Sequence, residues 1–171
     1  MAILFESQRL TVVEITEGFD LSKHSYLLKR IPQILTPAVV ENLPPYFHQI
    51  DSSEKARIWL ERMLLDSRLL QVKVEDNELI GFLFAYVEND ECAHIGYLLA
   101  EEYWGRGLAS ELLQGFIHEV EKSESWLKLI GGVDQSNIAS AKLLKKLGFI
   151  EQPAKDSSVV FYEYTIPQPQ S

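Results

Sequence analysis

Hydrophobic and polar residues follow two different periods along the chain. Alternating or β-branched apolar segments between charged or turn residues predict strands at 10–15, 69–75, 78–87, 93–99, 127–133 and 159–166. Apolar residues at helical spacing predict helices at 21–31, 52–68, 108–120 and 138–147. The order is a strand, one or two helices, three antiparallel strands, and then helix, strand, helix and strand. This order favours an α+β or mixed α/β fold.

The first two predicted helices have recognisable boundaries. The helix at 21–31 is expected to stop before Pro32, because proline disfavours helical geometry in the preceding residue. Four prolines in 32–50 then predict a packed irregular loop with a short helix. A capping box at Asp51 and Glu54 opens the helix at 52–68. Its apolar residues near one face are Ile58, Met63, Leu64 and Leu65.

Composition and charge narrow the class of protein. The chain has 171 residues, of which 46% are hydrophobic and 24% charged, as in ordinary globular proteins. We expect one domain over residues 1–166 and a disordered tail at 167–171, since no repeat or linker interrupts the pattern. The net charge of −9 disfavours nucleic-acid binding and gives a modest attraction for cationic ligands such as amines.

Cysteine usage and the first residues indicate the compartment. Cys92 is the only cysteine, so neither an intrachain disulfide nor a cysteine metal cluster is expected, and a reducing compartment fits. The opening MAILFESQRL contains no signal-peptide apolar region, and no stretch approaches the length of a membrane span. We therefore expect a cytoplasmic protein without a membrane segment and without a metal.

A glycine-rich turn lies between a predicted strand and a predicted helix, at Trp104–Ala109. Free N–H groups and the helix dipole bind anions at such a place. Gly105 and Gly107 let the backbone curl and approach a ligand closely. The turn matches neither a P-loop nor a Rossmann fingerprint. A plain glycine-rich turn remains the alternative.

This segment, GYLLAEEYWGRGLASELL, resembles motif A of the GNAT superfamily of acyl-CoA N-acyltransferases. Gly107 and Ala109 fill its last two positions, and Trp104 replaces the usual Gln or Arg, as in the branch resembling ribosomal-protein N-terminal (RimJ/RimL-like) acetyltransferases. A second segment, VDQSNIASAKLLKKLGF, resembles the motif that follows in this family. Its matching residues are Asn137, Ser140, Gly148 and Phe149. The resemblance covers roughly residues 70–165.

The resemblance implies a mostly antiparallel twisted sheet of about six or seven strands flanked by about four helices, with two strands splayed apart. It implies a monomer or homodimer that transfers acetyl from acetyl-CoA to a primary amine by direct attack in a ternary complex. The acceptor is either a protein N-terminus or a small amine. A non-catalytic acyl-CoA-binding or sensing module is the competing hypothesis.

The same resemblance implies where acyl-CoA binds. Backbone amides would cradle the pyrophosphate at Trp104, Gly105, Arg106, Gly107, Leu108 and Ala109. The pantetheine arm would pair with strand edges splayed near Leu98 and Leu99, where a backbone N–H holds the thioester carbonyl and stabilises the transition-state charge. Asn137 would cap its helix and leave its carbonyl free for the pantetheine.

Two residues are candidates for proton transfer. His94 lies near the strand position where relatives place a basic Glu, and the ordinary imidazole pKa near 6.5 suits removal of a proton from the amine. A packed or solvent-facing histidine is the alternative. Relatives use a Tyr acid seven residues after the Asn, but Leu144 stands there. Ser140, on the same helical face as Asn137, is the predicted substitute, with a packing role as the alternative.

Overall fold

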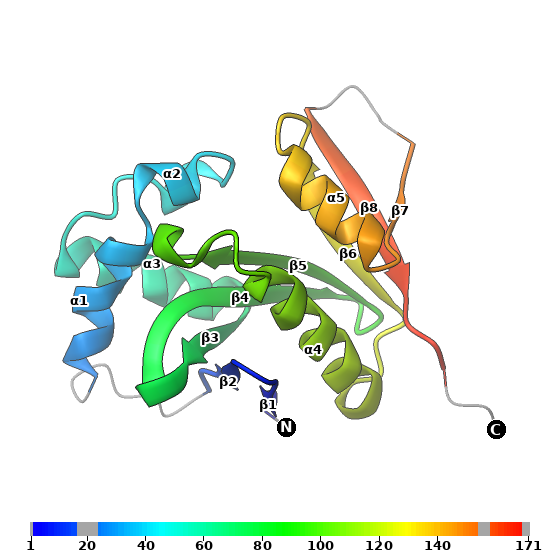
Figure 1. The fold of residues 1–171 in the computed structure, drawn as a ribbon, viewed down its shortest axis with the longest axis horizontal. Coiled ribbons are helices and arrows are strands. Elements are labelled where there is room, and N and C mark those ends of the chain that lie inside the picture. Colours follow the sequence, from blue (N-terminus) through cyan, green and yellow to red (C-terminus); the bar gives the residue numbers. More distant parts are fainter. Residues whose placement is uncertain (1, 17–23, 154–157, 169–171) are drawn as a thin grey trace.

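The computed structural model describes residues 2–16, 24–153 and 158–168. Within them the chain forms one sheet of eight strands in the order β1-β2-β3-β4-β5-β6-β8-β7 (Figure 1). The strands are β1 (Leu4–Glu6), β2 (Thr11–Glu14), β3 (Arg68–Val74), β4 (Glu78–Glu88), β5 (Cys92–Leu99), β6 (Lys128–Asp134), β7 (Ile150–Glu151) and β8 (Val159–Thr165). Every neighbouring pair is antiparallel except β5 and β6, which confirms the predicted mixed fold with a mostly antiparallel sheet.

Helices cover both faces of this sheet. The described residues contain the α-helices α1 (Ser25–Ile34), α2 (Pro37–Val40), α3 (Ser53–Asp66), α4 (Leu108–Ser123) and α5 (Ile138–Lys146). They also contain the 3₁₀ turns η2 (Pro45–Phe47), η3 (Glu75–Asn77) and η4 (Glu101–Tyr103). Helices α1, α2 and α3 gather on one side of the molecule, and α4 and α5 on the other (Figure 1). None of these helices combines the length and apolar character needed to span a bilayer.

Each face of the sheet carries its own hydrophobic core. On one face, α4 buries Leu112, Leu113 and Phe116 against strand residues such as Val72. On the other, α1 and α3 pack on strand residues such as Phe82. Successive residues of β5 follow the predicted alternation, since Leu98 belongs to the α3-side core and Leu99 to the α4-side core. The sheet is therefore buried on both faces where it approaches the end of β5.

Helix α1 corrects the predicted stop before Pro32. The helix runs through Pro32 to Ile34, and its described part starts at Ser25, whereas residues 21–23 of the prediction lie outside the described residues. The side chains of Leu27, Ile31 and Ile34 are fully buried in the α3-side core. Burial of this stripe outweighs the cost of a proline inside the helix, because tertiary packing supplies most helical stability.

Helix α3 was predicted correctly in position but not in the face that it buries. The predicted cap at Asp51 is wrong by one residue, because Ser52 is the N-cap and accepts a hydrogen bond from the Lys55 N–H at 3.2 Å. Ile58 and Leu65 are 57% and 86% exposed. Of the predicted residues only Met63 is buried, and the other buried residues of the helix are Ala56, Trp59 and Leu60. Trp59 decides this rotation, since its large ring packs edge-on against Phe82 at 5.3 Å between centroids.

The two strands of the parallel pair separate part-way along their length. Pairing joins Cys92–Ile95 of β5 to Lys128–Gly131 of β6 and ends there. Beyond this point β5 stays paired with β4 up to Leu99, and β6 stays paired with β8 up to Asp134. The predicted splay is therefore present, and its first unpaired residue, Gly96, comes two residues before Leu98. It opens a wedge between two halves of one sheet.

Candidate active site

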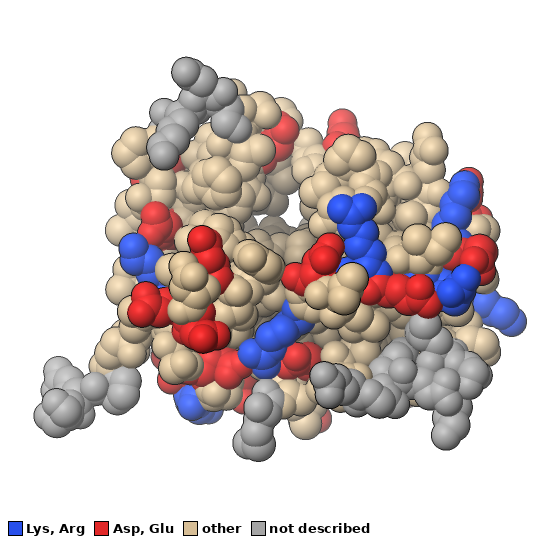
Figure 2. Space-filling model, turned by 180° about the vertical axis from the view of Figure 1, so that it is seen from behind, with Lys and Arg blue, Asp and Glu red and all other residues tan. Residues whose placement is uncertain are grey.

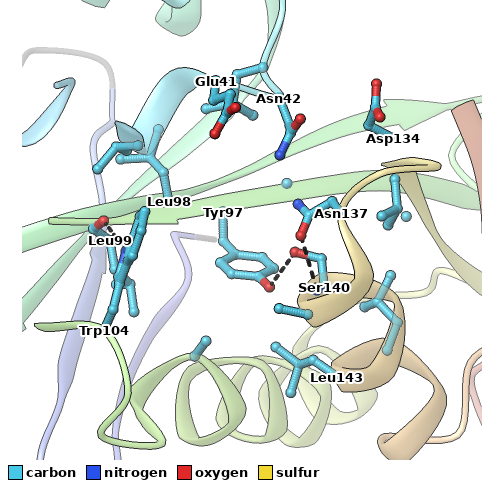
Figure 3. A pocket seen from close by; sticks show the side chains of 18 of the residues that line it. Glu41, Asn42, Tyr97, Leu98, Leu99, Trp104, Asp134, Asn137, Ser140 and Leu143 are labelled. Carbon is cyan, nitrogen blue, oxygen red and sulfur yellow. Dashed lines mark hydrogen bonds between the residues drawn. The ribbon is translucent and has the colours of Figure 1, made fainter. Parts of the chain in front are cut away.

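A cleft of about 600 Å³ occupies this wedge. Viewed from behind, the molecule shows a hollow near its centre, bordered mainly by uncharged residues (Figure 2). The lining comes from the loop around α2, the end of β5, the start of α4, the end of β6 and the first turns of α5. Figure 3 shows side chains from these segments converging on the cleft. Elements distant in sequence thus build one site.

The glycine-rich turn forms one wall of the cleft. Gly105 and Gly107 both have left-handed backbones, with φ of 75° and 76°. Helix α4 begins directly after Gly107, and no side chain caps its first turn. The N–H groups of Leu108, Ala109 and Ser110 therefore lack intrahelical acceptors and stay available at the positive end of the helix. This geometry is suited to binding an anion.

Trp104 has a different role from its neighbours in the turn. Its backbone N–H donates to the Glu101 carbonyl at 3.1 Å, so this amide is already used within the chain. Its indole Nε1 donates to the Leu99 carbonyl at 2.8 Å (Figure 3). The predicted amide cradle therefore starts at Gly105. The Trp104 side chain lines the cleft, and its hydrogen bond to Leu99 holds the end of β5.

Sequence reasoning missed the side chains that support this turn. The Glu111 carboxylate, in the first turn of α4, accepts hydrogen bonds from the Ser7 hydroxyl and from the backbone N–H and Nε of Arg9. Arg9 Nη1 also donates to the Arg106 carbonyl at 2.8 Å. A Cβ at Gly107 would lie 3.6 Å from Arg9 Nη2. The β1–β2 loop thereby holds the turn from outside.

The exposed edge of β5 presents backbone groups to the cleft. The Ala100 N–H donates to Ile80 of β4 at 2.7 Å, whereas the Leu99 carbonyl points away from β4 to Trp104. Because backbone directions alternate along a strand, the N–H groups of Tyr97 and Leu99 face the open side and those of Leu98 face β4. Leu99 therefore fits the predicted role of N–H donor, and Leu98 contributes its side chain to the wall.

Helix α5 brings the second motif to the cleft. The Asn137 side chain caps the helix by accepting from the Ser140 N–H at 3.2 Å. The Asn137 carbonyl was predicted to be free for the pantetheine. It instead accepts a hydrogen bond from the Ala141 N–H at 3.2 Å. Its side-chain N–H₂ is the group that faces the cleft (Figure 3). The Ser140 hydroxyl lies 3.2 Å from the Tyr97 hydroxyl.

His94 lies outside the residues that line the cleft. Its Nε2 is 2.9 Å from a Glu88 carboxylate oxygen, and its ring stands beside Tyr86. Contact with a carboxylate favours the tautomer with the proton on Nε2, which leaves Nδ1 able to accept a proton. His94 shares its sheet face with Gly96, a lining residue two positions further along β5. Its role as a base stays a prediction.

Polar side chains gather at the edge of the cleft between α2 and α5 (Figure 3). Glu41 and Asn42 directly follow α2, and Asp134 is the last residue of β6. The Asp134 carboxylate accepts hydrogen bonds from the Ser136 hydroxyl and N–H, and these bonds hold its pKa below the usual 3.8. At neutral pH this entrance therefore carries negative charge.

Comparison with protein families decides the classification. Residues 27–150 match the model of the acetyltransferase (GNAT) domain. The chain belongs to the GNAT family. No curated protein matches the sequence, whereas solved structures match it well in fold. The glycine-rich turn and the cleft between β5 and β6 are therefore features of a GNAT domain.

Three solved structures illustrate the likeness of this GNAT domain to others. RimL, the ribosomal L7/L12 alpha-N-protein acetyltransferase, in complex with coenzyme A has a TM-score of 0.78 and 18% identity, over 96% of this chain and 98% of that one. The self-immunity acetyltransferase MccE with acetyl-CoA and AMP has a TM-score of 0.74 and 14% identity, over 94% of each chain. The ribosomal-protein-S5-alanine acetyltransferase from Vibrio fischeri has a TM-score of 0.70 and 18% identity, over 96% and 97%.

The support of the turn by Glu111 predicts a pH-dependent loss of stability in Glu111→Gln. Partial burial alone would raise the pKa of Glu111, but hydrogen bonds from Ser7 and Arg9 outweigh it and hold the pKa below the usual 4.5. A carboxyl with a lowered folded pKa stabilises the fold above its unfolded pKa and loses this effect as the pH falls through the folded pKa. We expect Glu111→Gln to lower the free energy of unfolding by about 1–2 kcal/mol at neutral pH.

Urea denaturation of both proteins at neutral pH and at roughly pH 3 measures this difference. The gap between them should shrink at the acidic pH. Glu61→Gln is the matched control, because Glu61 pairs with Arg57 on the exposed surface of α3 and should cost little at either pH. A gap that is the same at both pH values would contradict the assigned role of the Glu111 charge.

Proposed function

We propose that this GNAT domain transfers an acetyl group from acetyl-CoA to a primary amine, by direct attack of the amine in a ternary complex. One observation carries the proposal: a turn of free backbone amides and an unpaired strand edge open into the same cleft. The first suits a pyrophosphate and the second an extended chain of amide groups. Acyl-CoA carries both in one molecule.

The chain's own groups fit the parts of acyl-CoA. The N–H groups of Gly105 to Ala109 would hold the pyrophosphate, and the exposed edge of β5 would pair with the pantetheine arm. The Leu99 N–H, held in place by the contact of its carbonyl with Trp104, would donate to the thioester oxygen. A donor fixed before the reaction stabilises the charge that develops on this oxygen. The structures of RimL in complex with coenzyme A and of MccE in complex with acetyl-CoA, which share this fold, support this fit.

The acceptor is proposed to enter past Glu41, Asn42 and Asp134. Carboxylates at this entrance and the net charge of −9 attract a protonated amine. Attack requires the neutral amine, so another group must take a proton from it. His94 is proposed for this step, with Glu88 orienting its ring. Protein N-termini are the first acceptors to test, because RimL, which has the same fold, is an alpha-N-protein acetyltransferase of ribosomal L7/L12.

The deciding experiment follows free thiol released from acetyl-CoA in the presence of N-terminal peptides, polyamines and amino sugars. We expect release that depends on one class of amine and yields equal amounts of acetylated product by mass spectrometry. Binding of acetyl-CoA without release by any acceptor would favour the competing acyl-CoA-binding or sensing module. Absence of binding would refute the proposal as a whole.

The turn predicts that Gly107→Val blocks acetyl-CoA binding. A valine at φ 76° is strained, and its side chain crowds the place proposed for the pyrophosphate. Isothermal titration calorimetry should show the affinity for acetyl-CoA reduced by more than about 100-fold, which is a loss of at least about 2.7 kcal/mol of binding free energy. Gly148→Val is the control, because Gly148 has a φ of 102° after α5 and does not line the cleft. Unchanged affinity in Gly107→Val would refute the assigned pyrophosphate loop.

The proposed base predicts that His94→Ala lowers turnover and spares acetyl-CoA binding. We expect kcat to fall about 10–100-fold at neutral pH. The deficit should narrow as the pH rises, because more of the amine is then neutral without help. His118→Ala, which removes an exposed histidine of α4, is the control. If His94→Ala has normal kcat, water or another group removes the proton.

A further inference from the structure

Two hydroxyl groups from opposite sides of the cleft meet inside it. Tyr97 Oη and Ser140 Oγ share a hydrogen bond of 3.2 Å, although the residues are 43 positions apart. Tyr97 belongs to β5 just after pairing with β6 ends, and Ser140 lies in the first turn of α5 (Figure 3). The contact bridges the two halves of the sheet that the splay separates.

Both hydroxyls are held in place by their surroundings. The Asn137 cap fixes the first turn of α5 at the Ser140 N–H. Tyr97 packs against the α4-side core, and its burial raises the pKa of the phenol above the usual 10, while the hydrogen bond with Ser140 opposes this shift. The phenol is therefore protonated over the whole physiological range and is able to give a proton.

Other hydroxyls that line the described cleft have different partners. The Tyr103 hydroxyl donates to a Glu78 carboxylate at 2.8 Å. The Ser110 hydroxyl accepts from Gln114 within α4. Leu144, seven residues after Asn137, is buried. Gly131 leaves room for it, because a Cβ at position 131 would lie 2.9 Å from Leu144 Cδ1. That helix position therefore serves packing.

We propose that Tyr97 and Ser140 form one proton-donating pair for the sulfur leaving group, with Ser140 as the catalytic residue and Tyr97 as the positioning residue and proton source behind it. The inference rests on the proposed acetyl transfer. A serine hydroxyl is a much weaker acid than a phenol, so Ser140 needs a neighbour that returns a proton as it gives one up. Tyr97 is that neighbour.

Protonation of the departing sulfur requires one proton from each hydroxyl of the pair. After the amine nitrogen has bonded to the carbonyl carbon, the C–S bond breaks and its electron pair stays on sulfur. Ser140 Oγ gives its proton to sulfur and takes the proton of Tyr97 Oη. The products are a neutral thiol and a phenolate, which regains a proton from solvent. The pair thus ends in its starting state.

Three variants test the pair: Tyr97→Phe, Ser140→Ala and the double variant. Each single change should lower kcat about 10–100-fold and leave KM for acetyl-CoA within about threefold. The double variant should be no slower than the slower single variant, because both changes break the same relay. Tyr162→Phe is the control, since its hydroxyl bonds Glu151 on the far strands and lies outside the cleft.

A second measurement does not depend on an acceptor. Hydroxyl donors aimed at sulfur favour the thiolate, so the thiol of bound coenzyme A should have a lower pKa in the natural protein than in Tyr97→Phe or Ser140→Ala. Ultraviolet absorbance of the thiolate follows this titration. The shift should persist in Tyr162→Phe.

The outcomes separate this inference from the proposed function. Normal kcat and an unchanged thiol pKa in Tyr97→Phe, beside an active natural protein, would overturn the pair and leave acetyl transfer standing. Independent, additive losses in the double variant would overturn the relay in the same way. A natural protein that binds coenzyme A with a lowered thiol pKa but acetylates no amine would confirm the pair and refute the transferase.

Discussion

The early end of pairing between β5 and β6 is the constraint on which the rest of the site depends. Pairing stops at Ile95 and Gly131, so beyond these residues each strand keeps one neighbour, β4 or β8, and has an unpaired edge on the other side. Buried backbone polar groups need partners of some kind. Trp104 supplies one for the Leu99 carbonyl, and the N–H groups along the same edge remain for a bound molecule. A sheet that closed here would have satisfied these groups internally and left no cleft.

A cleft between two halves of one sheet also needs contacts that hold its walls in fixed positions. The β1–β2 loop meets this need on one side, because Arg9 ties the Arg106 carbonyl and the Glu111 carboxylate together at the start of α4. The Tyr97–Ser140 contact meets it on the other. The hydrogen bonds of Arg9 and Glu111 hold the glycine-rich turn, and the Tyr97–Ser140 contact joins β5 to α5. The site is thus braced from both the sheet edge and the chain's first strands.

Local signals explain what the sequence could predict. The glycines of the turn, the Asn137 cap and the alternation in β5 are all set by neighbours a few residues away, and the structure has them as expected. Contacts between residues far apart in the sequence could not be predicted from such local signals. Arg9 and Glu111 are 102 residues apart, and nothing near either one indicates the other. The buried face of α3 and the passage of α1 through Pro32 likewise depend on the core that receives them.

The cleft separates the charges that the proposed reaction must handle. Carboxylates at the entrance suit an amine that arrives protonated, and His94 lies beyond the lining on the same sheet face as Gly96. Inside, the Leu99 N–H and the Tyr97–Ser140 hydroxyls are neutral donors within apolar walls. Neutral donors stabilise a developing negative charge without holding a permanent opposite charge that would have to be desolvated. A positive side chain in this interior would attract the anionic parts of the cosubstrate to the wrong place. Carboxylates at the entrance and neutral donors inside the cleft therefore favour entry of the amine past Glu41 and Asp134.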